Sequence, residues 1–174
     1  IFDQSDVLLV GTDLTFKREF TNKFKSSLAL NYLWSNNLDN NGKLINQPPV
    51  RLENNFDFKT NSFWKVNYSE ISLKPSYTFR QFQAPMTITP DNLISGAAKI
   101  TPETQIFDFK DAPEGYFLLD FSWKLNINDF GISLIVKNIL NEKYRNYLNE
   151  MRYFADEPGR NFIINLSYNF KKKN

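Results

Sequence analysis

The side chains best suited to bind a ligand are two arginines and a tyrosine near the C-terminal end: Arg145, Arg152 and Tyr153. Guanidinium groups pair with carboxylates and phosphates, and a phenol adds a hydrogen bond, so these three residues fit an anionic ligand. The same stretch holds three acidic residues, Glu150, Asp156 and Glu157, which would form loop–loop salt bridges with the arginines equally well. We therefore take the two arginines and the tyrosine as candidate ligand-binding residues, with a structural role as the alternative.

The chain offers little to a catalytic or metal-binding site. It has no histidine and no cysteine, and so lacks the commonest general base, the thiol nucleophile and the usual transition-metal ligands. One long connector is acidic, and a solvated loop is favoured there over a cation site: Glu103, Asp108, Asp111 and Glu114. We expect no enzymatic activity, no cofactor and no metal site. A net charge of +2 without a basic stripe gives no sign of nucleic-acid binding.

The composition is unusual for a soluble domain of 174 residues. Aromatic residues make up 16% of the chain, yet the mean hydropathy is −0.46. This balance is typical of strands that show one face to lipid and the other to a wet interior. The sequence contains no run of about 18 apolar residues, as a membrane-spanning helix requires. It also shows no signal peptide, so we expect a cleaved leader or a fragment of a longer chain.

Alternation of apolar and polar residues is the dominant pattern, and it predicts an all-β fold of seven strands. The alternating segments cover residues 8–16, 28–34, 50–58, 71–79, 119–125, 131–138 and 162–170. Before the fourth strand, Trp64, Val66 and Tyr68 alternate with the opposite parity, which predicts a bulge near Ser69 and Glu70. We expect at most one helical turn, within residues 140–154.

The connectors between these strands alternate strictly between short and long. Short turns are expected at residues 21–23, 60–62 and 128–130, and long loops near 36–49, 84–115 and 141–159. Outer-membrane β-barrels sort their connectors in this way, with tight periplasmic turns and long extracellular loops. Residues 1–170 are thus expected to form antiparallel transmembrane barrel strands, and residues 171–174 a basic periplasmic tail.

The C-terminal third resembles the end of TonB-dependent receptors. Residues 136–144, VKNILNEKY, are similar to the V-x-N-L-F-N-x-x-Y signature of that family, and Pro158-Gly159-Arg160 to its usual start of the last strand. Upstream, Gly11-Thr12-Asp13-Leu14 and Gln47-Pro48-Pro49-Val50-Arg51-Leu52 resemble strand beginnings of the same barrels. The version seen here looks like receptors of the Bacteroidetes. In contrast to the family, Lys171 to Asn174 follow the aromatic Phe170.

The resemblance implies a bacterial outer-membrane receptor that imports a scarce nutrient, iron-siderophore-like or similar. Such a barrel has twenty-two strands, so the seven here would be its last third. The implied partners are the remaining barrel strands and a plug domain, in the same or another chain, with TonB acting through that absent plug. Outer-membrane lipid and a small nutrient molecule are the other implied partners. The alternatives are a plugless porin and a soluble β-rich binding domain.

Overall fold

The computed structural model describes residues 5–39, 42–60, 66–101 and 106–170. Its seven strands are β1 (Val7–Thr21), β2 (Phe24–Asn37), β3 (Arg51–Thr60), β4 (Val66–Thr78), β5 (Tyr116–Ile127), β6 (Phe130–Lys137) and β7 (Asn161–Tyr168). They form one antiparallel sheet in which each strand pairs with its neighbours in sequence, in the order β1 to β7. The predicted all-β fold of seven strands is therefore confirmed, and within the described residues β1 and β7 each keep one edge unpaired.

One face of the sheet is largely apolar. Cross-strand partners point to the same side of a sheet, so the register identifies the residues that share a face. One row runs Phe24, Phe58, Ile71, Trp123, Leu134 and Ile164. Many of these side chains are exposed, and Leu166 on β7 is 76% exposed. Exposed apolar surface on this scale marks a face that meets lipid or another apolar surface.

The opposite face carries charged and polar side chains. Near the tight-turn end, Glu70 lies within ion-pair distance of Lys59 (3.5 Å) and Lys124 (3.9 Å) on the two neighbouring strands. Nearer the loop end, Glu53 pairs with Lys74 at 3.1 Å and Arg51 at 3.2 Å. These contacts join β3, β4 and β5 on this side of the sheet. We call the two sides the apolar face and the polar face.

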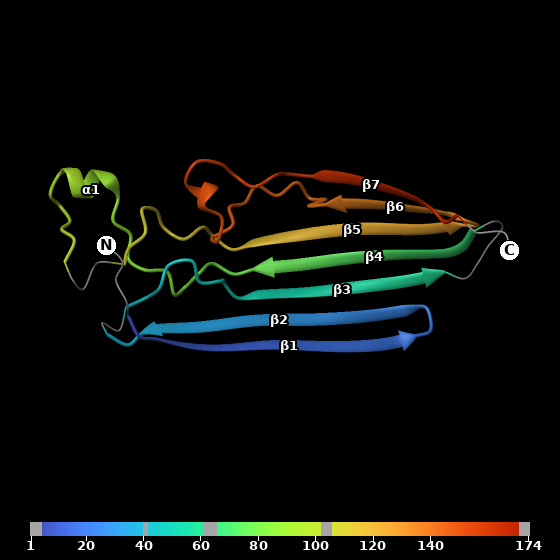
Figure 1. Ribbon diagram of the computed structural model, residues 1–174, viewed down its shortest axis with the longest axis horizontal. Helices are drawn as coiled ribbons and strands as arrows, with labels where there is room; N and C mark the ends of the chain where they lie inside the picture. The colour runs from blue at the N-terminus through green and yellow to red at the C-terminus, as the bar shows by residue number, and fades with distance from the viewer. Residues whose placement is uncertain (1–4, 40–41, 61–65, 102–105, 171–174) are drawn as a thin grey trace.

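Long and short connectors lie at opposite ends of the sheet (Figure 1). The turns after β1 and β5 leave one end, and the segments 38–50, 79–115 and 138–160 extend from the other. The expected turn at 60–62 falls mostly outside the described residues, as do Trp64 and the tail at 171–174. The strand β4 ends at Thr78, so the second long loop begins earlier than the sequence pattern indicated.

The bulge in β4 lies nearer its start than predicted. The register shifts between Val66 and Tyr68, not at Ser69 and Glu70. Val66 pairs with Ile127 and stays with the apolar face, whereas Tyr68 pairs with Asn126. The Tyr68 hydroxyl then donates to Glu70 Oε2 at 2.5 Å on the polar face, which explains why an aromatic residue departs from the apolar rows.

In the described part of the chain, helix is limited to two short pieces in the long loops, α1 (Pro90–Ile94) and the 3₁₀ turn η2 (Glu150–Tyr153). The second lies within the stretch where a helical turn was expected. In the part of the chain that the structure describes, we find no helix with the length and apolar character needed to cross a membrane.

Candidate functional site

The last long loop begins with two asparagines in the left-handed backbone region. Asn138 has φ of 50° and Asn141 of 55°, a conformation that asparagine tolerates better than most residues. The Asn138 side chain accepts from the backbone N–H of Glu142 and donates to its carbonyl, both at 2.9 Å. Asn141 Oδ1 accepts from the N–H of Arg160 at 3.0 Å. These two residues of the recognised motif therefore build the turn after β6 and hold the start of β7.

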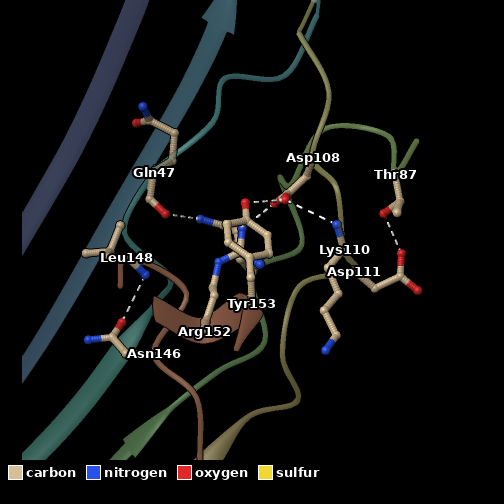
Figure 2. A network of polar contacts seen from close by, with 10 residues as sticks. Gln47, Thr87, Asp108, Lys110, Asp111, Asn146, Leu148, Arg152 and Tyr153 are labelled. Carbon is tan, nitrogen blue, oxygen red and sulfur yellow. Dashed lines mark hydrogen bonds and ion pairs between the residues drawn. The ribbon is translucent and has the colours of Figure 1, made fainter. Parts of the chain in front are cut away.

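The long loop between β4 and β5 folds back onto β2. The Gln83 side chain accepts from the N–H of Ser35 (3.1 Å) and donates to the carbonyl of Leu33 (2.9 Å). These groups lie where β2 extends past the end of its partner β3. Gln81 donates to the carbonyl of Gln47 at 2.8 Å, which joins this loop to the first long loop (Figure 2). Both glutamines are almost fully buried, and their hydrogen bonds to β2 and to the first long loop hold this loop in place.

A buried ion pair joins the second and third long loops. Arg152 Nη2 donates to Asp108 Oδ2, and both side chains are only 3% exposed. The Tyr153 hydroxyl donates to Asp108 Oδ1 at 2.6 Å and accepts from Arg152 at 3.0 Å (Figure 2). The guanidinium also lies over the rings of Tyr147 and Tyr153, at 4.7 and 4.4 Å. We call Asp108, Tyr147, Arg152 and Tyr153 the loop clamp.

The clamp holds its tyrosines neutral. Burial, followed by the hydrogen bond to Asp108, raises the pKa of Tyr153 to about 12. Burial also raises the pKa of Tyr147, with a smaller contribution from Asp108. Both tyrosines of the clamp therefore stay protonated at neutral pH. As long as Tyr153 is protonated, its hydroxyl can donate a hydrogen bond to the Asp108 carboxylate.

Arg145 occupies a different position from the other two candidates. Its Nε donates to Asp156 Oδ1 at 2.7 Å and its Nη1 to the carbonyl of Arg152 at 2.8 Å. The hydrogen bond from Arg145 lowers the pKa of Asp156. Arg145 also lines a cavity of about 420 Å³ between the ends of the second and third loops. Of the three candidates, it is the one placed to meet a molecule from solution.

The partner of Arg152 was missed in the sequence. Glu150, Asp156 and Glu157 were the expected partners; Asp156 pairs with Arg145, whereas Arg152 pairs with Asp108 of the second loop. Asp108 had been grouped with an acidic, solvated stretch. Of that stretch, Glu114 pairs with Arg80 at 2.7 Å, Asp111 accepts from Thr87, and Glu103 lies outside the described residues. Among the described residues, no three acidic side chains are grouped closely enough to hold a metal ion.

The sheet and its loops define a class of fold, a run of consecutive strands from an antiparallel membrane β-barrel. No protein-family model and no curated protein matches the sequence. Among solved structures the chain is similar to the copper transporter OprC, with a TM-score of 0.73 over 95% of this chain and 17% sequence identity. The match covers 24% of OprC, so this chain spans about a quarter of that protein's length.

Proposed function

We propose that this chain is the C-terminal part of the barrel of a TonB-dependent receptor in a bacterial outer membrane. The observation that carries the proposal is the division of one sheet into an apolar face and a polar face, with all described long loops at one end. A transmembrane strand needs about 9–11 residues when tilted. The strands β1 to β5 have 10 to 15 residues, enough to cross the hydrocarbon layer.

The distribution of buried residues argues against a soluble β-sandwich. Only four hydrophobic residues are buried among those described: Val66, Ile88, Ala112 and Tyr147. Three of the four lie in the long loops, and only Val66 belongs to the sheet. A sandwich instead buries the inner face of each sheet against the other. Here the apolar face needs a partner of large area, and membrane lipid provides one.

The free edges of β1 and β7 need further strands. Unpaired N–H and C=O groups are not tolerated in hydrocarbon, so an open sheet cannot cross a membrane alone. We infer that both edges pair with other strands of the same barrel, in the same or another polypeptide. The match to about a quarter of OprC supports a barrel larger than seven strands. The plug domain and TonB are the other partners of this proposal.

The cargo in this proposal is a scarce nutrient, such as an iron–siderophore complex, which binds non-covalently. The chain is then a transport component and not an enzyme. Because OprC is a copper transporter, copper ions belong in the same test. The clamped loops above the polar face are where the nutrient would first be held.

Uptake measurements test this function. We would delete the gene for the complete protein in its native bacterium and follow uptake of radiolabelled ferric siderophores and copper ions. We expect complementation by the wild-type gene to restore uptake of one of them. That uptake should be abolished by a protonophore and by loss of TonB. Uptake that persists without the proton gradient would instead support a plugless porin, the alternative noted above.

A further inference from the structure

The cavity of about 420 Å³ that Arg145 borders lies between the second and third loops. It is lined by the end of the second loop around Lys110 and Glu114, by Tyr116 at the start of β5, and by residues 142–145. Tyr116 shares the polar face with Thr78 and Arg51, its neighbours in the sheet register. The cavity therefore opens at the loop end of the polar face, where a molecule would enter a barrel.

The charges around this cavity do not cancel. Two of its acidic residues already have partners, since Asp156 pairs with Arg145 and Glu114 with Arg80. The charges that remain are the ammonium groups of Lys110 and Lys143 and the carboxylate of Glu142. Within the described ranges, neither lysine has an ion-pair partner, and the side chain of Lys110 extends away from the clamp (Figure 2). Both lysines also contribute to the lowered pKa of Asp156, so their charges act on the cavity.

An aromatic pair forms another part of the cavity wall. The rings of Tyr116 and Tyr144 lie with centroids 4.4 Å apart and an interplanar angle of 36°. Both residues line the cavity and are half-buried. Burial raises the pKa of Tyr144, so its ring carries no charge at neutral pH. A ring surface beside two unpaired ammonium groups suits a ligand that joins a planar ring to a negative group.

We propose that this cavity is a binding subsite for a ring-bearing carboxylate, with Lys110 and Lys143 holding the anion and Tyr116 and Tyr144 packing against the ring. Its use in import rests on the proposed receptor function, whereas binding itself does not. Glu142 lowers the affinity, because it places one carboxylate beside the site. Arg145 orients the wall through Asp156 and the carbonyl of Arg152.

The test is a ligand-observed ¹⁹F NMR titration of the complete barrel protein, purified in detergent, with three probes. These are 4-fluorobenzoate, the neutral ring 4-fluorobenzamide, and fluoroacetate, which has the carboxylate but no ring. We expect saturable binding of 4-fluorobenzoate, at least about fivefold tighter than either of the others. Binding of the neutral ring as tight as that of 4-fluorobenzoate, or no saturable binding at all, would overturn the proposal.

Variants assign the roles of the side chains. Lys110→Glu and Lys143→Glu should each weaken 4-fluorobenzoate binding about tenfold, because each replaces an attraction by a repulsion. Glu142→Gln should strengthen it, and Lys143→Arg should retain it. Lys43→Glu is the matched control, an exposed lysine in the first long loop that does not line the cavity. Retained heat-modifiable mobility in electrophoresis shows that each variant is folded.

Two outcomes separate this subsite from the receptor function. If Lys110→Glu and Lys143→Glu leave binding unchanged while uptake remains TonB-dependent, the subsite is wrong and the receptor function stands. If binding follows the charges but uptake does not require the proton gradient, the subsite stands and the receptor function fails.

Discussion

Breaking the buried pair of Asp108 and Arg152 should release the second long loop from the third. The variant Asp108→Asn keeps the shape of the side chain but leaves the Arg152 guanidinium, 3% exposed, without a carboxylate. Removing one partner of such a pair costs about 3–5 kcal/mol. The smaller value corresponds to a rise of about 100-fold in the population of the opened loops.

Hydrogen exchange of individual backbone amides measures this opening. The N–H of Ile88 donates to the carbonyl of Asp108 at 2.8 Å, and the N–H of Asp108 donates to the carbonyl of Met86 at 3.0 Å. We expect both amides to exchange about 100-fold faster in Asp108→Asn, while amides in the middle of β4 are unaffected. The matched control is Asp111→Asn, which removes an exposed carboxylate three residues away whose side chain contacts Thr87.

A double variant separates charge from shape. Asp108→Asn combined with Arg152→Met removes both charges, so the double variant should be less destabilised than the sum of the singles, by about 2 kcal/mol. Additive effects, or unchanged exchange in Asp108→Asn, would refute the conclusion that this pair holds the loops together.

The remaining predictions concern the two faces of the sheet, the pH response of the loops and the motif asparagine. In the complete barrel refolded in lipid vesicles, Leu166→Arg on the apolar face should cost about 2–4 kcal/mol in urea unfolding, and Ser122→Arg on the polar face far less; equal costs would show that the faces are assigned wrongly. The pKa of Tyr153 is raised to about 12, above its ordinary value of 10.0, so its contribution to loop stability is complete below pH 10 and is lost between pH 10 and 12. Amide exchange corrected for its intrinsic pH dependence should show this loss, and Tyr153→Phe should reduce it; an unchanged profile in that variant would contradict the assignment. Asn138→Ala should lower the stability of the third loop by about 1–3 kcal/mol, because it removes two side-chain hydrogen bonds at φ of 50°. Asn138→Gly should cost less, and proteolysis of the loop would measure both.

The sheet was predictable because strand pairing repeats a simple pattern. Each strand alternates with a period of two, and the short turns after β1 and β5 allow only an antiparallel neighbour. Aromatic residues lie near both ends of the strands, where Tyr168 pairs with Phe130 at the turn end and Trp34 with Val10 at the loop end. The bulge was misplaced because Tyr68, an aromatic residue, leaves the apolar rows to bond Glu70.

The loop clamp was not predictable, because its two charges are separated by 44 positions in the sequence. The period of two that relates residues within strands does not extend to irregular loops. The second and third long loops each hold several acidic residues that could have paired with Arg152. Arg152 and Tyr153 were found because of their chemical types, but those types do not reveal burial. Lys110 and Lys143 gave no sequence signal at all, since an exposed lysine in a loop is the commonest use of that residue.

A division of roles within the loops follows from these contacts. The three candidates differ in what they contact: Arg152 and Tyr153 bond each other and Asp108, whereas Arg145 borders an open cavity. Buried groups that are bonded to one another set the positions of the loops, and a ligand can bind only to groups that solvent reaches. The loops are fixed by internal bonds from Gln83, Asn138 and Arg152, so the cavity exists before a ligand arrives. Binding then requires little further ordering of the loops, so its entropic cost is small. The choice of ligand depends on the exposed charges at the cavity wall.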